Sequence, residues 1–305
     1  MSNVTLSLRK KISGAKELRS VIRTMKAVAA SNIEKYENSV RALIDYYRTV
    51  ELGLGAYFRA HAAGVASGEP QEPIRHSQKE GSKGGAIGVV IFGSDQGLVG
   101  HFNDTISDFT IETLEAFSET QAKVSLWAVG ERVCSQMTEA GYPPKGILAV
   151  PQSLQSVAPL VGQILRESQF EQQVTELHLF FNRPKSGQFY EPFHQRLLPL
   201  DKSWRSQMVQ LAWPTKTSPE VLGPGPATLL DLVGEYLFVG LFRACVESLA
   251  SENASRLAGM QRADKNIEEM LATLNGQYNH LRQTSIDEEL FDLISGFEAL
   301  ALEDI

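Results

Sequence analysis

The fold is decided by residues 229–260, which read LLDLVGEYLFVGLFRACVESLASENASRLAGM. Apolar side chains recur in this stretch every three or four residues, the spacing that places them on one face of an α-helix. The pattern belongs to a longer range without proline, residues 227–305, and Pro224 and Pro226 stand just before it, where the start of a helix tolerates them. A helix of this length would measure roughly 110 Å, so it needs a partner along its length.

A second long helix is predicted near the N-terminus. Residues 4–58 also lack proline, and their apolar residues recur at a mean step of about 3.5, the coiled-coil period. Residues 1–35 carry eight Lys or Arg against two Glu, whereas residues 227–305 carry fourteen Asp or Glu against five Lys or Arg. Because the two ends have opposite charge, we expect the two helices to pack together. Two long helices in separate bundles are the alternative.

The middle of the chain predicts an α/β domain with a largely parallel sheet. Short apolar runs typical of strands alternate with helical segments: strands are expected at 86–92 (AIGVVIF), 123–129, 147–150 and 176–181, and helices at 103–120, 131–140 and 156–170. One more strand is expected at 187–200, on an edge of the sheet, because Pro192 cannot donate to a strand ladder. The fold class is therefore α/β plus a long α-helical coiled coil formed by the N- and C-terminal helices.

Glycine and proline mark the boundaries between five segments. They are an N-terminal coiled-coil helix (1–60), a mobile linker (61–85), the central α/β domain (86–200), a second linker (201–226) and a C-terminal coiled-coil helix (227–305).

Composition narrows the classes of function. The net charge of -7 over 305 residues argues against a nucleic-acid-binding protein, whose domains are usually basic. Cys134 and Cys245 each lie within an apolar helical pattern and are expected to be buried thiols. The basic N-terminus is not followed by an apolar segment, and the most apolar run, 229–246, is interrupted by charged residues. We therefore expect neither a secretory signal nor direct insertion into a membrane.

The search for catalytic chemistry finds no credible constellation. Residues 93–100 (GSDQGLVG) follow a predicted strand, where doubly wound folds bind phosphate, but their glycine spacing matches no nucleotide motif, so a tight turn is the better interpretation. His178 and His194 are interpreted as core or surface residues rather than metal ligands, and the acids at 287–289 as a helix surface. No catalytic, cofactor or metal residue is predicted.

Several stretches resemble the gamma subunit of rotary F-type ATP synthases, in the family's order and over essentially the whole chain. They are residues 24–31 (TMKAVAAS), 94–103 (SDQGLVGHFN), 247–252 (ESLASE), 256–260 (RLAGM) and 282–290 (RQTSIDEEL). The chain departs from the family at Gln96 and Val99, where Arg and Cys are usual, and at Asp287, where Thr is usual. From these departures we hypothesise an alternative F-type complex, with sodium as a candidate coupling ion.

The resemblance implies a non-catalytic rotor that couples ion-driven rotation to ATP synthesis or hydrolysis. Its terminal helices would form an antiparallel coiled coil inside a ring of alpha and beta subunits, one copy per complex. The α/β domain would lie at the foot, near the epsilon subunit and the membrane c-ring, at the cytoplasmic face of the plasma membrane. No cofactor is implied.

By residue carry-over, the contacts with the beta subunit would be made by Arg9, Met25, Lys26, Arg256, Arg282, Gln283 and Asp287. Those with the epsilon subunit and the membrane ring would be made by Ser94, Asp95, Gln96 and Gly97. Two other functions stay open from the residues alone: a nucleotide-binding α/β enzyme with coiled-coil arms, and a structural coiled-coil adaptor.

Overall fold

The computed structural model describes residues 3–64, 86–118, 123–170, 174–185, 188–217, 219–220 and 225–303. The chain divides into two compact units, one made of Met1–Ala29 and Leu257–Ile305 and the other of Ala30–Arg256. Two long helices, α1 (Asn3–Gly64) and α6 (Gly225–Glu303), contribute to both units.

In the first unit, α1 packs along α6 through a small apolar core. Its buried members are Ile12, Ala15 and Ile22 of α1 and Met260, Ile267 and Leu271 of α6. The ion pair of Arg19 with Asp264 and the contact of Arg9 with Tyr278 show that the two helices are antiparallel here. The predicted pairing of the terminal helices is therefore confirmed, and its oppositely charged ends meet.

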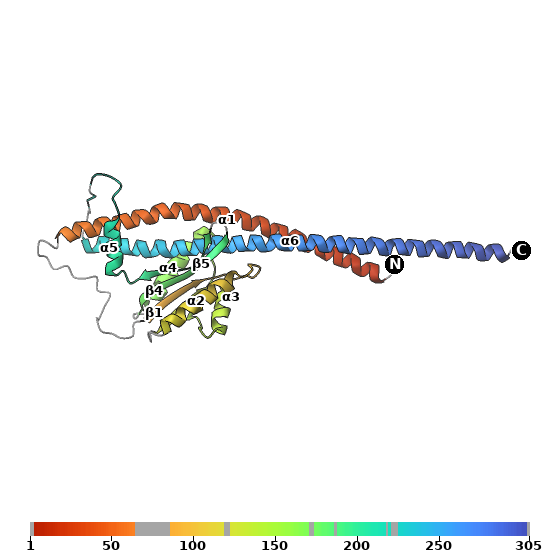
Figure 1. The fold of residues 1–305 in the computed structure, drawn as a ribbon, viewed down its shortest axis with the longest axis horizontal. Helices are drawn as coiled ribbons and strands as arrows, with labels where there is room; N and C mark the ends of the chain where they lie inside the picture. The colour runs from red at the N-terminus through yellow and green to blue at the C-terminus, as the bar shows by residue number, and fades with distance from the viewer. Residues whose placement is uncertain are drawn as a thin grey trace. The chain divides into compact units, whose positions relative to one another are not determined.

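The second unit contains a five-stranded sheet together with the neighbouring parts of α1 and α6 (Figure 1). The strands are β1 (Ala86–Phe92), β2 (Val124–Val129), β3 (Gly146–Leu148), β4 (Val174–Lys185) and β5 (Gln188–Leu198). Their order is β3-β2-β1-β4-β5, parallel except for the antiparallel pair β4–β5. The helices between them are α2 (Phe102–Ser118), α3 (Glu131–Glu139) and α4 (Val157–Phe170).

The central strand β1 is buried on both faces, which explains why it reads as a continuous apolar run. Alternate residues of β1 point to opposite faces: Val89 and Ile91 pack with side chains of α2 and α3, whereas Val90 and Phe92 pack with those of α1, α4 and α6. The C-terminal half of α1 and the N-terminal part of α6 are thus built into the core of the sheet domain.

The structure differs from the predicted segments at the linkers. Helix α1 continues to Gly64, and the rest of the first predicted linker lies outside the described residues. The second predicted linker contains a helix, α5 (Lys202–Gln210), whose first turn is capped by Asp201: its Oδ1 accepts the Trp204 N–H at 2.8 Å. The edge position of residues 187–200 is confirmed, since β5 ends the sheet.

No helix in the described part of the chain is long and apolar enough to cross a membrane.

Candidate partner-binding sites

The loop after β1 is closed by hydrogen bonds within itself. Ser94 is fully buried; its N–H donates to Oδ1 of Asn103 at 2.9 Å, and its hydroxyl accepts from Nδ2 of Asn103 at 2.9 Å and donates to the Gln96 carbonyl at 2.9 Å. The partner contact of Ser94 stays a prediction; in this conformation its N–H and hydroxyl are hydrogen-bonded within the chain. Asn103, the last residue of the stretch 94–103, thus holds Ser94, its first residue, in place.

Asp95 joins the loop to two other segments. Its Oδ1 accepts the N–H of Glu131, at the start of α3, at 3.1 Å, and its Oδ2 accepts the N–H of Val150 at 3.0 Å. A carboxylate at a helix N-terminus is favoured by the unpaired N–H groups there. Both oxygens of Asp95 are therefore engaged within the chain, and its side chain positions the segment around Val150.

Helix α6 fills the crevice where an open α/β sheet usually binds a ligand. That crevice lies at the carboxyl ends of neighbouring strands whose connections leave in opposite directions. In this sheet these strands are β1 and β4. Ser255 of α6 donates to the Val99 carbonyl at 2.5 Å, and Ser251 donates to the Asn182 carbonyl at 3.1 Å. Helix α6 thus occupies the position where a nucleotide would bind, which supports the interpretation of residues 93–100 as a turn.

The tip of the loop is what remains exposed. Gln96 is exposed, and Leu98 presents 65% of its surface to solvent while holding a φ of 65°. A bulky residue adopts this left-handed conformation only where its surroundings impose it. Of the four residues predicted to contact partners here, Gln96 has the accessible side chain, and Leu98 is an addition that sequence reasoning missed.

Arg256 lies in a polar hollow of the second unit rather than on an open surface. The hollow is lined by Asn32 and Tyr36 of α1, by Asp95, Gln96, Val150, Pro151 and Gln152 of the loops, and by Leu249, Glu252, Asn253 and Arg256 of α6. The Arg256 side chain is only 16% exposed, and its Nη2 donates to Oε1 of Glu252 at 2.6 Å. The predicted contact residue is thus already paired within its own helix.

The pair of Glu252 and Arg256 has an unusual electrostatic balance. Burial raises the pKa of Glu252, and the neighbouring Arg256 only partly offsets that effect. Nε of Arg256 is buried and has no hydrogen-bond partner in the described part of the chain. Sequence reasoning missed Glu252, although its i, i+4 spacing to Arg256 is the spacing of helical ion pairs.

In the first unit, part of the basic N-terminal surface is neutralised within the chain. Arg19 donates through Nε to Oδ1 of Asp264 at 3.0 Å, and Lys26 donates through Nζ to Oδ2 of Asp264 at 3.2 Å. Nε of Arg23 lies 3.7 Å from the same Oδ1. The hydrogen bonds from Arg19 and Lys26 lower the pKa of Asp264. Lys26, a predicted partner contact, is half-exposed, and its ammonium group is paired with Asp264 of α6.

Met25 and Arg9 take different positions in the same unit. Met25 is half-buried and packs against the apolar core between α1 and α6. Arg9 is exposed, with its guanidinium carbon 5.8 Å from the centre of the Tyr278 ring. Of these two predicted contacts, Arg9 is free to meet a partner through its polar atoms, and Met25 chiefly supports the helix pair.

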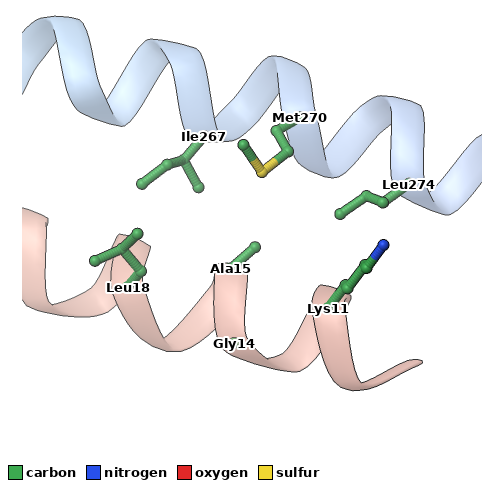
Figure 2. Close-up of a pocket in the computed structure, with 7 residues that line it drawn as sticks. All are labelled: Lys11, Gly14, Ala15, Leu18, Ile267, Met270 and Leu274. Carbon is green, nitrogen blue, oxygen red and sulfur yellow. The ribbon is translucent and has the colours of Figure 1, made fainter. Parts of the chain in front are cut away.

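A shallow apolar groove runs beside this core. Figure 2 shows its lining residues: Lys11, Gly14, Ala15 and Leu18 of α1, and Ile267, Met270 and Leu274 of α6. Because Gly14 and Ala15 have almost no side chain, the two helices leave the groove unfilled. Leu18 and Met270 are each about half exposed at its rim.

The C-terminal part of α6 carries the last three predicted contacts. Arg282, Gln283 and Asp287 are all exposed. Next to them, apolar side chains that are also exposed continue the helical spacing: Ile286, Leu290, Phe291, Leu293 and Ile294. Phe297, at the next position of this pattern, has a side chain outside the described part of the structure.

Both cysteines are buried, and the described ranges contain no candidate metal cluster. Cys134 and Cys245 are free and buried, as predicted, and burial raises the pKa of the Cys245 thiol. In the described ranges, no group of three or more His, Cys, Asp or Glu side chains has the geometry to hold a metal ion.

Comparisons with known proteins agree along the whole chain. A family model described as ATP synthase matches residues 5–300. The chain is 27% identical to an ATP synthase gamma chain of Geotalea uraniireducens (96% of this chain, 98% of the relative) and 27% identical to one of Legionella pneumophila, strain Corby, with the same coverage. The rotor of the Euglena gracilis mitochondrial ATP synthase has a similar fold, with a TM-score of 0.58 and 14% identity over 93% of this chain and 99% of that one.

Proposed function

This chain belongs to the gamma-chain family of F-type ATP synthases, and we propose that it is the central rotor shaft of such a complex. In this role it couples rotation driven by ion flow to ATP synthesis or hydrolysis on a ring of alpha and beta subunits. It is itself non-catalytic, and one copy serves each complex. It reaches the cytoplasmic face of the membrane through the complex, at the epsilon subunit and the c-ring.

The observation that carries the proposal is the uncovered end of α6. The contacts of α1 with α6 in the first unit extend to Arg9 with Tyr278, whereas apolar side chains of α6 stay exposed from Ile286 to Ile294. Exposed apolar side chains that follow one another along a helix are a feature of interaction sites. A helix that continues its apolar face beyond its own partner fits insertion into a sleeve formed by other subunits.

The contact residues divide into two groups by their accessibility. Arg9, Arg282, Gln283 and Asp287 have exposed side chains, and we propose that they contact the beta subunits directly. For Met25, Lys26 and Arg256, whose side chains pack or pair within the chain, we propose a supporting role. We propose the loop tip, residues 96–98, as the contact surface toward the epsilon subunit or the c-ring, with Ser94 and Asp95 fixing its shape.

Coexpression with alpha and beta subunits tests the assignment. We expect a ring of three alpha and three beta subunits to be recovered with one copy of this chain. The double substitution Leu290→Asp and Ile294→Asp should reduce that recovery. Ile147→Asp, at an apolar residue of β3 with similar exposure, is the matched control and should leave it unchanged. If the wild-type chain is coexpressed and the ring is recovered without it bound, the rotor function is refuted.

Charge reversal can then separate coupling from folding. Arg282→Glu changes an exposed side chain and should lower ion transport per ATP hydrolysed in the reconstituted complex, with little change in thermal unfolding, because exposed charges contribute only about 0–1 kcal/mol to stability. Lys26→Glu is the contrasting variant, because it places an acid beside Asp264 and should also lower the unfolding temperature. If wild type and Arg282→Glu transport the same number of ions per ATP hydrolysed, Arg282 is not part of the contact surface.

A further inference from the structure

Two histidines form a hydrogen-bonded pair across the last two strands of the sheet. His178 of β4 and His194 of β5 place Nδ1 and Nε2, respectively, 2.7 Å apart, and their rings stack with centres 5.0 Å apart and 14° between their planes. Sequence reasoning treated the two separately because they are sixteen residues apart and match no ligand spacing. The antiparallel register of β4 and β5, which aligns Phe180 with His194, brings them together.

The pair is enclosed by aromatic rings. Phe180 stacks on His194 with ring centres 4.7 Å apart, and Phe117 of α2 lies 4.9 Å from the His178 ring. His178 is only 3% exposed, and His194 is half-buried. Water therefore has little access to solvate a positive charge on either ring.

Two charged groups face the pair, one from each strand. On β4, Oε2 of Glu176 lies 3.1 Å from Nε2 of His178. On β5, Arg196 acts on both rings through its positive charge and is itself paired with Asp201 at 2.6 Å. From α2, the ring of Phe117 faces both histidines.

The geometry limits how many protons the pair can hold. Glu176 accepts a hydrogen bond, so Nε2 of His178 carries a proton. With both rings neutral, Nδ1 of His178 then has a lone pair and accepts from Nε2–H of His194. One added proton is tolerated: His178 becomes an imidazolium beside Glu176, and its Nδ1–H donates to His194. A second added proton leaves two N–H groups and two positive charges facing each other, and the hydrogen bond is lost.

We propose that Glu176, His178 and His194 form an acid-sensitive clasp that holds the edge strand β5 against β4 and opens when both imidazoles are protonated. Strand β5 ends the sheet, so β4 is its neighbour in the ladder and the clasp acts on that single seam. Because β5 leads to Asp201, the cap of α5, opening the seam also loosens the attachment of α5. The clasp is independent of the rotor function proposed above.

The sign of the pH effect follows from burial. Desolvation lowers the pKa of both rings below the ordinary value of 6.5, and that of His194 to about 4. A released strand binds protons more readily, so the clasp is fully effective above pH 6.5 and weakens as the pH falls toward 4. For His194 alone, the equilibrium constant for opening should rise roughly 70-fold between pH 7.5 and pH 4.5.

Hydrogen–deuterium exchange of the full-length chain at pH 7.5 and 4.5 tests the clasp, with each rate divided by the intrinsic exchange rate at that pH. We expect opening of β5 to rise by about 70-fold, while β1, in the middle of the sheet, changes far less. In His194→Gln, which keeps a hydrogen-bonding side chain that does not titrate, the rise should fall to a few-fold. His101→Gln is the control because His101 is 92% exposed, and it should keep the full rise.

Two results would overturn the clasp. One is the same acid-induced rise for β5 in His194→Gln as in wild type, which would mean that the pair is merely structural. The other comes from histidine NMR of the unmodified chain, which needs no variant: a His194 ring titrating near pH 6.5 would show that the pair is not held as described. A lowered titration of both rings would support it.

Discussion

Gly130 holds the backbone turn that supports the loop after β1. Its φ of 115° and ψ of 135° lie in a region that residues with a side chain rarely adopt, and a Cβ there would lie 2.8–2.9 Å from the backbone N, C and O of Ser94. Gly130→Ala therefore combines strain of about 1–3 kcal/mol with overpacking of about 1–3 kcal/mol. We expect the free energy of unfolding to fall by roughly 2–6 kcal/mol, the sum of these two effects.

Two other glycines separate the contributions in the same urea-unfolding assay. Gly141 has a φ of 87° and open space where the methyl group of an alanine would lie, so Gly141→Ala should show backbone strain alone, about 1–2 kcal/mol. Gly97 has neither a positive φ nor a close neighbour, so Gly97→Ala should lie within about 0.5 kcal/mol of wild type. If Gly130→Ala costs no more than Gly141→Ala, the close approach of Gly130 to Ser94 does not exist and the reasoning fails.

Three further outcomes are expected from single substitutions. Glu252→Gln leaves the cation of Arg256 buried and unpaired and should lower the free energy of unfolding in urea by about 3 kcal/mol. The double variant with Arg256→Gln should recover part of this loss. A double variant whose loss equals the sum of the two single losses would contradict the pairing. Ser255→Ala removes the donor to the Val99 carbonyl and should cost about 1 kcal/mol, whereas an unchanged midpoint would show that the contact is dispensable. The pKa of Asp264 is lowered, so its carboxylate stabilises the chain above its ordinary pKa and loses this effect as acid protonates it. In Asp264→Asn the unfolding temperature should therefore fall less steeply with decreasing pH than in wild type. Equal slopes in the two proteins would contradict the pairing.

The long helices and the strands could be predicted because their signals are periodic and local. Residues 229–260 specify a helix through spacing alone, and the β-branched run of β1 identifies a buried strand. Helix α5 was missed because it is short and polar and lies in a proline-rich range, although Asp201, a favoured N-cap residue, was a usable signal. Its position depends on Trp204 packing against Phe58 and Tyr236, contacts that no local pattern contains.

The candidate sites were harder to predict than the fold. The basic residues of the N-terminal helix were visible in the sequence, but the acid that neutralises Lys26 is 238 residues away. The loop motif was also visible, yet two of its members, Ser94 and Asp95, use side-chain atoms in hydrogen bonds within the chain. A motif shows which residues a family retains in a loop; only the packed structure separates those that build the loop from those that face outward.

The two serines that attach α6 to the sheet domain have a mechanical consequence. Ser251 and Ser255 lie one helical turn apart, and each donates to a backbone carbonyl of a different segment, Asn182 at β4 and Val99 after β1. A single such bond would act as a pivot, about which the helix could twist. Two bonds on successive turns oppose both twisting about the helix axis and sliding along it, so torque applied to α6 is passed to the backbone of β4 and of the loop after β1.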